Sequence, residues 1–435
     1  TADGKFQGWK VVLPGRRPLA TPAFADGVLF LGGGFGSYEF YALDALTGNV
    51  VWNYQTSDDG PTAAVVDQGF VVFNTESCEL EVLTVAGKSV WKKWLGDPLM
   101  SMPATADGRV YMAFPDSRGD HRHYLACFAL RDGQEFWRTP ITGEIITAPV
   151  LAEGNVYLSC LDGTMFCVRQ VDGEVLWQET KNATSSPVVH EAHCYFSQGS
   201  EGQFRNPNHG DSWTARKRER LSRRHSSPAA ATVPLETTSD WADYLDVEKR
   251  EMGSPVYAAS QHLDSAVGFA HFKGHAKMEQ AMRNLGHAHV ASVWAYQGSK
   301  PFYANGRLYS SMGKTTKCVE AHSDELRWSD TLGDAAAEAG PEQEVLDSAL
   351  TPPAIVNGKL FQGAANGEVR CLDAETGGRL WVTKIESSIV FQPVIARGWI
   401  YLPTSDGSLY AIQTGNTHDD GWYMWGATSA HNGII

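Results

Sequence analysis

Short apolar runs recur along this sequence at a regular spacing, each followed by a tight turn and a second short run. In the second run apolar and polar residues alternate, which is the pattern of a half-buried β-strand. The turns between the runs are Asp-Gly, Asn-Gly or similar, a strong short-range signal of a β-hairpin. Seven of the first runs begin at a proline: Pro22, Pro103, Pro149, Pro187, Pro301, Pro353 and Pro393. We therefore expect a chain of repeated antiparallel hairpins.

A second signature ends each repeat: a small residue, a glycine six positions later and a tryptophan four positions after that. It is clearest in ALDALTGNVVW, residues 42–52, and in CLDAETGGRLW, residues 371–381. Further copies are Cys127/Gly133/Trp137 and Cys167/Gly173/Trp177, with degraded forms at Glu81/Gly87/Trp91 and Cys318/Asp324/Trp328. Six copies of one eleven-residue spacing indicate that the chain consists of internal repeats.

Together the two signatures describe units of four antiparallel strands and about 40 residues, the size of a β-propeller blade. Seven proline-led runs and an eighth at residues 62–66 predict eight blades. The last unit, residues 390–413, has three expected strands and no signature tryptophan, so we expect residues 7–13 to complete it. The sequence thus predicts an all-β fold: a single eight-bladed propeller of four-stranded blades over residues 1–435, closed by its N-terminal strand.

These repeats resemble those of the pyrroloquinoline-quinone (PQQ) type eight-bladed propellers, whose tryptophan-docking motif has the same eleven-residue spacing. That family includes quinoprotein alcohol dehydrogenases and the propeller lipoprotein of the bacterial outer-membrane barrel assembly machine. The resemblance implies the fold and a periplasmic or extracellular location. It does not decide between an enzyme and a binding protein.

Each motif tryptophan is expected to form a wedge between neighbouring blades, with its ring over a small residue and its N–H bonded to a partner. The eight expected wedges are Trp9, Trp52, Trp91, Trp137, Trp177, Trp294, Trp328 and Trp381. Four of the seven cysteines take the small position of the motif. We expect them to be packing residues on different blades, too far apart for disulfides.

The residue before each proline is expected to point toward the central channel, where propellers usually hold a ligand. The candidates for cofactor binding there are Thr21, Met102, Ser186, Lys300 and Gln392. Only Lys300 is charged, whereas a quinone with several carboxylates needs several cations and a metal-binding carboxylate. The adjacent cysteine pair of the quinoprotein dehydrogenases is also missing. We therefore predict no catalytic residue and no cofactor, with PQQ and a divalent metal as the alternative.

The fifth blade departs from the repeat. Trp177 and Trp294 are 117 residues apart, against 34 to 53 for the other neighbouring pairs from Trp52 onward. This predicts an insertion over residues 199–285, partly irregular and partly helical, with an amphipathic helix at residues 271–285. Because long loops on rigid scaffolds often carry function, we expect the insertion to bind a partner.

Two groups of residues in and beside this insertion could bind something. A basic run contributes the partner-binding candidates Arg216, Lys217, Arg218, Arg220, Arg223 and Arg224. It could meet an acidic protein or simply dock onto the chain's own acidic surface. The histidines with metal-binding spacing are His271, His275, His287 and His289, although scattered surface histidines are the commoner explanation.

Composition narrows the function further. The chain has 50 acidic and 36 basic residues and a net charge of −14, which argues against nucleic acid and anionic membranes as partners. It has no apolar run of the roughly 18 residues that a membrane-spanning helix needs. We expect a non-enzymatic scaffold for protein–protein interaction in the bacterial cell envelope. The alternatives are a PQQ- or metal-dependent oxidoreductase and a cofactor-less subunit of a redox complex.

Overall fold

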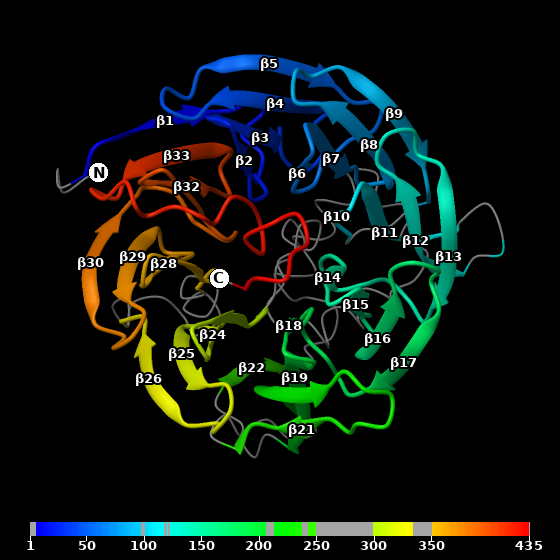
Figure 1. Cartoon of the computed structure of the whole chain (residues 1–435). Coiled ribbons are helices and arrows are strands. Elements are labelled where there is room, and N and C mark those ends of the chain that lie inside the picture. The colour runs from blue at the N-terminus through cyan, green and yellow to red at the C-terminus, as the bar shows by residue number, and fades with distance from the viewer. Residues whose placement is uncertain are drawn as a thin grey trace.

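The computed structural model describes residues 6–96, 101–116, 120, 122–205, 213–236, 242–248, 299–333 and 350–434. These residues form strands and turns, and no α-helix occurs among them. Eight antiparallel sheets are arranged in a ring around a central axis (Figure 1). The predicted all-β, eight-bladed propeller is confirmed. None of the described elements is a helix long and apolar enough to cross a membrane.

Blade one shows why the repeat folds as it does. Its strands run outward from the axis in chain order: β2 (Ala23–Ala25), β3 (Val28–Gly32), β4 (Glu39–Asp44) and β5 (Val50–Gln55). The inner strands read as continuous apolar runs and are buried, because neighbouring blades cover both of their faces. The outermost strand alternates between exposed and half-buried residues, because one of its faces meets water.

The other regular blades repeat this order of four strands. Blade two contains β6 (Val65–Asp67), β7 (Phe70–Asn74), β8 (Glu79–Thr84) and β9 (Ser89–Trp94). Blade three contains β10 (Ala104–Ala106), β11 (Arg109–Pro115), β12 (His123–Ala129) and β13 (Glu135–Ile141). Blade four contains β14 (Val150–Ala152), β15 (Asn155–Ser159), β16 (Thr164–Arg169) and β17 (Val175–Thr180).

Blades six and seven follow the same plan. Blade six contains β23 (Phe302–Ala304), β24 (Arg307–Met312), β25 (Thr315–Glu320) and β26 (Leu326–Thr331). Blade seven contains β27 (Ala354–Val356), β28 (Lys359–Gly363), β29 (Glu368–Asp373) and β30 (Arg379–Lys384).

The ring closes through the N-terminal strand. Blade eight takes β31 (Val394–Ala396), β32 (Trp399–Pro403) and β33 (Ser408–Gln413) from the C-terminal part of the chain. Its outermost strand is β1 (Gly8–Val12), which pairs antiparallel with β33. The predicted closure is confirmed, and β33 thereby gains a partner on its outer edge.

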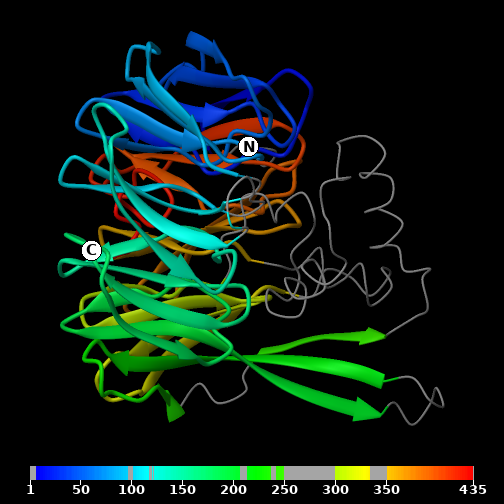
Figure 2. The same cartoon turned by 90° about the vertical axis from the view of Figure 1, so that its right-hand side faces the viewer.

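Blade five carries a long extension. It consists of β18 (Val188–His190), β19 (His193–Arg205), β20 (Trp213–His225) and the short β21 (Val233–Pro234), and β22 (Ala242–Glu248) also pairs with β20. We call residues 199–205, 213–219 and 242–248 the arm. In Figure 2 the arm projects from one face of the propeller.

The structure revises the extent of the expected insertion. The range 199–285 contains all of β20 and β21, which are the third and fourth strands of blade five. The base of β20 is therefore part of the propeller, and only the arm extends beyond the blade. The helix expected at residues 271–285 lies outside the described residues.

After β33 the chain turns back to the axis. Residues 419–434, which we call the C-terminal segment, cross the centre of the ring (Figure 1), toward the face opposite the arm (Figure 2). The repeat pattern did not predict this segment.

Candidate functional site

The motif tryptophans reach from one blade to the next. The indole Nε1 of Trp52, on the outer strand of blade one, donates to the Val85 carbonyl of blade two at 3.0 Å. The same bond joins Trp9 to Ala45, Trp91 to Leu130, Trp137 to Gln170, Trp177 to Ser226 and Trp328 to Ala374. Trp381 packs between Phe6 and Phe361. Trp294 lies outside the described residues.

The residue under five of these rings, those of Trp9, Trp52, Trp91, Trp137 and Trp328, is a glycine of the next blade at the motif position. A Cβ at Gly87 would lie 2.7 Å from the Trp52 ring, and one at Gly133 would lie 2.8 Å from the Trp91 ring. The small residue that opens the motif instead pairs with the tryptophan of its own blade, as Cys127 does with Trp137. The expected wedge therefore lies over glycine rather than over the small residue, because only glycine admits an indole at this distance.

The expected channel residues meet at the axis. Thr21, Met102, Ser186, Lys300 and Gln392 are all at most 1% exposed. Thr21 Oγ1 donates to the Gln392 carbonyl at 2.9 Å, and Gln392 Nε2 donates to the Pro353 carbonyl at 2.7 Å. These bonds tie the inner strands of neighbouring blades together.

Lys300 is the cation of this ring. Its Nζ donates to the Pro187 carbonyl and lies 5.7 Å from the centre of the Phe302 ring and 6.0 Å from that of Trp425. Complete burial holds the pKa of this amine well below its usual value.

The channel does not fit PQQ, the cofactor of the dehydrogenase branch of this fold. Trp425, 1% exposed, fills the axis together with Met102, Ala148 and Phe391. A quinone with several carboxylates needs open space and several cations, whereas this centre is packed with apolar side chains around one buried lysine. Among the described residues no group of three or more His, Cys, Asp or Glu could hold a metal ion.

The basic run lies on β20, the middle strand of the arm. Cα positions of Arg218 and Asp243 face each other across the pair of β20 with β22, and those of Thr214 and Glu248 do the same. The basic residues of the arm are Arg205, Arg216, Lys217 and Arg218. Its acidic residues are Glu201, Glu219, Asp243, Asp246 and Glu248. The arm as a whole is thus nearly balanced in charge and is not a basic patch.

The last two cations of the run belong to the propeller. Arg224 is 3% exposed, its Nε lies 2.9 Å from Glu179 Oε2, and its guanidinium stacks on the Trp177 ring at 3.6 Å. It therefore joins blade five to blade four. These bonds occupy Arg224 within the chain.

Arg223 joins blade five to blade six. Its Nη1 lies 3.1 Å from Asp324 Oδ1 and donates to the Ala321 carbonyl at 3.4 Å. This carbonyl corresponds to the one that accepts an indole N–H at six other blade junctions. Arg216, Lys217, Arg218 and Arg220 remain as candidates for partner binding. The candidates His271, His275, His287 and His289 lie outside the described residues.

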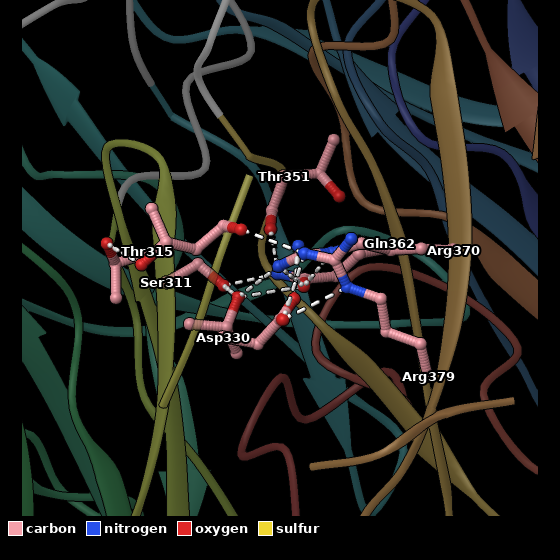
Figure 3. A network of polar contacts seen from close by, with 9 residues as sticks. Ser311, Thr315, Asp330, Thr351, Gln362, Arg370 and Arg379 are labelled. Atoms are coloured by element: carbon pink, nitrogen blue, oxygen red, sulfur yellow. Dashed lines mark hydrogen bonds and ion pairs between the residues drawn. The ribbon is translucent and has the colours of Figure 1, made fainter. Parts of the chain in front are cut away.

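A buried polar network between blades six and seven was missed by the sequence analysis (Figure 3). Arg370 is fully buried; its Nη1 lies 2.7 Å from Asp330 Oδ2, and its Nη2 donates to Thr316 Oγ1 at 2.9 Å. Its Nε donates to Gln362 Oε1, and Arg379 binds the other oxygen of Asp330. Each guanidinium nitrogen of Arg370 has a partner, so the network joins blades six and seven. We call Arg370 with Asp330, Thr316, Gln362 and Arg379 the Arg370 clamp. The signal was an arginine between Val369 and Cys371, at an inner position of the short strand β29.

A smaller acidic cluster lies between blades one and two. Asp58 Oδ2 accepts hydrogen bonds from Thr75 Oγ1 and from the Ser77 N–H, and the Glu76 N–H donates to the Asp59 carbonyl. Burial and the neighbouring Asp59 raise the pKa of Glu76 to about 8. The folded chain thus holds a proton here that an exposed glutamate would lose.

Comparison with known proteins places these features in a family. A protein-family model described as "Outer membrane protein assembly factor BamB" matches residues 79–231 and 313–425. The outer membrane protein assembly factor BamB of Yersinia pestis is 23% identical over 172 residues, which are 36% of this chain and 42% of that protein. The match thus spans less than half of that relative's length.

Two solved structures share the fold. BamB of Moraxella catarrhalis superposes with a TM-score of 0.57 and 12% identity, covering 93% of this chain and 96% of the other. Quinohemoprotein alcohol dehydrogenase ADHIIG of Pseudomonas putida HK5 superposes with a TM-score of 0.56 and 14% identity, covering 94% and 76%. At these identities the similarity shows the fold alone.

Proposed function

Because the chain belongs to the family of the outer membrane protein assembly factor BamB, we propose that it is a non-enzymatic scaffold that binds other proteins in a bacterial cell envelope. The family's name supports a periplasmic location and a role in assembling outer-membrane proteins. The packed channel, which does not fit a quinone, supports binding rather than oxidation as the task of this propeller.

One observation carries the proposal: the arm projects from a single face of the ring (Figure 2). The C-terminal segment lies toward the opposite face, and the inner strands are packed at the axis. The face that bears the arm is therefore the surface that we assign to the partner.

The base of the arm offers the most specific contact. Arg220 is only half-buried, and its Nε is a buried donor without a hydrogen-bond partner among the described residues. A guanidinium carries five N–H donors, so the part of the half-buried Arg220 side chain that meets solvent can donate to a carboxylate or carbonyl of a partner. We infer that the partner contacts the arm at its base through Arg220, with Arg216, Lys217 and Arg218 beside it.

The test shortens the arm without cutting the blade. Cα positions of Gly199 and Glu219 face each other across β19 and β20, so residues 200–218 can be replaced by the hairpin turn Asn-Gly. Proteins cross-linked to the parent in envelope extracts of its host should be lost with the shortened chain. As a matched control, Lys88, Arg131 and Lys384, which are exposed on three other blades, are changed together to Glu and should leave the partners unchanged.

If the parent and the shortened chain are cross-linked to the same proteins, the arm does not bind the partner. The oxidoreductase alternative has its own readout in the absorbance spectrum and metal content of the purified protein. A stoichiometric chromophore or metal would favour that alternative over the scaffold.

A further inference from the structure

The C-terminal segment pairs with the free inner edges of the blades. The innermost strand of each sheet has one neighbouring strand, so its other edge faces the axis with unpaired backbone groups. The segment accepts hydrogen bonds from these edges at 2.6 to 3.0 Å in five blades. The pairs are Phe24 N–H to Tyr423, Thr105 to Ser429, Leu151 to Ala430, Tyr303 to Gly433 and Ile395 to Trp422.

Polar side chains attach the segment to blades five and seven. Asn432 binds both backbone groups of Val189 in blade five, accepting from its N–H and donating to its carbonyl at 2.8 Å each. Asp419, fully buried, binds Lys359 Nζ and Asn357 Nδ2 of blade seven at 2.9 Å. These are paired contacts rather than loose surface bonds.

Three aromatic side chains anchor the segment in depth. Trp422 is fully buried and meets the Phe302 ring edge-on at 5.0 Å, and Trp425 fills the axis. The ring nitrogens of His431 lie 2.8 Å from the Pro103 carbonyl and 2.7 Å from the Trp425 carbonyl. Backbone pairing along an exposed edge together with a few deep anchors is the way in which folded domains bind peptides.

We propose that the inner edges of the propeller form a binding site for an extended peptide, and that the chain's own C-terminal segment is its resident ligand. The segment belongs to no blade, because blade eight ends with β33, and residues 415, 417 and 418 of the connection are exposed. The covalent link to β33 is thus separable from the contacts that hold the segment. The inference does not depend on the proposed scaffold function.

The experiment cuts this link in the folded protein. A protease recognition sequence is inserted after Thr417, and the purified full chain is nicked and passed over a gel-filtration column. The peptide is expected to stay with the propeller and to be displaced by an excess of a fluorescent synthetic peptide of residues 419–435. Binding of that peptide is then measured by fluorescence anisotropy.

Matched peptides test the anchors. The Trp425→Ala and Asn432→Ala peptides should bind at least about tenfold more weakly than the parent peptide, because each removes a buried contact. A Thr428→Ala peptide, changed at an exposed position, should bind as the parent does. The proposal is overturned if the nicked peptide leaves a propeller whose melting temperature is unchanged. It is equally overturned if nicking unfolds the protein or if the Trp425→Ala peptide binds as well as the parent.

Discussion

At the scale of single residues, the contact that repeats between blades is an indole ring lying on a glycine. The glycine has a positive φ, which turns the chain between the third and fourth strands, and its missing side chain leaves room for the ring of the preceding blade. One residue thus serves the turn and the blade junction together. The two roles can be separated by experiment, because other turn glycines have the same φ and no ring above them.

Gly87→Ala should lower the free energy of unfolding by roughly 2–4 kcal/mol, since the new Cβ would lie 2.7 Å from the Trp52 ring in addition to the strain at a φ of +79°. Gly69→Ala is the control, because its φ is +81° and nothing lies within 4 Å of its Cβ. Chemical denaturation measures both variants. Equal losses would mean that the ring contact contributes nothing beyond backbone strain.

Glu76 should make the stability of the protein depend on pH. Its pKa is raised in the folded chain to about 8, so folding binds a proton, and stability falls as pH rises from about 4.5 to 8. Glu76→Gln removes this loss and should raise stability at pH 8 by roughly 1 kcal/mol or more, with little effect at pH 4. Melting temperatures across this range check the sign. Glu386→Gln, at an exposed position, should show no such trend.

In the Arg370 clamp, one carboxylate, that of Asp330, forms an ion pair with the buried Arg370 and another with the exposed Arg379. The two pairs can therefore be compared by mutation. Arg370→Met leaves Asp330 with its exposed partner Arg379, whereas Asp330→Leu leaves the fully buried guanidinium uncompensated. Asp330→Leu should therefore cost about 3–5 kcal/mol, and the double variant less than Asp330→Leu alone. Arg379→Met should cost at most about 1 kcal/mol. Urea denaturation of the two single variants and the double variant measures the coupling between Arg370 and Asp330. If the losses in free energy of unfolding from Arg370→Met and Asp330→Leu add up in the double variant, the clamp is contradicted.

At the scale of the element, each strand depends on its position in the blade. The short innermost strands offer a free edge to the axis and receive the C-terminal segment there. The outer strands carry the tryptophans and face solvent on alternate residues. Blade five differs, because its outer strand has only two residues and Arg223 takes the position at Ala321 that an indole takes elsewhere.

Removing β1 should weaken the ring at its closure. Deleting residues 1–13 strips β33 of its neighbour, removes the Trp9 bond to Ala45 and uncovers Trp381 by taking away Phe6. Losing a well-packed tryptophan alone costs about 3–5 kcal/mol, so the melting temperature should fall clearly. Val12→Ser, at an exposed position of the same strand, is the control. An unchanged melting temperature of the deletion would contradict closure by this strand.

At the scale of the whole molecule, the propeller has two unlike faces. The arm projects from one face, and the C-terminal segment lies toward the other while its tryptophans fill the axis (Figure 2). Contacts such as that of Thr21 with Gln392, 371 positions apart in the chain, exist only because the ring is closed. Stability and partner binding are therefore assigned to different parts of the fold.

The boundary of the arm can be tested by stability alone. Replacing residues 200–218 by Asn-Gly should leave the melting temperature close to that of the parent, because the base of β20 stays in place. Excising residues 199–285 should lower it strongly, because it also removes the fully buried Leu221 and the ion pair of Arg224 with Glu179. Circular dichroism during heating compares the two. Similar melting temperatures of the two variants would mean that the base of β20 is not needed for the stability of the propeller.

The sequence by itself determined the repeat, the number of blades and the closing strand. These follow from local patterns: a turn, a short apolar run and the spacing from glycine to tryptophan, each read within about ten residues and repeated along the chain. It also indicated that Thr21, Lys300 and Gln392 lie near the axis, because each precedes the proline that marks an innermost strand. Only the tertiary structure decided those features that occur once and not in every blade. Trp425 at the axis, Arg370 opposite Asp330, and the base of β20 inside blade five depend on contacts between distant segments, and such contacts leave no periodic trace in the sequence.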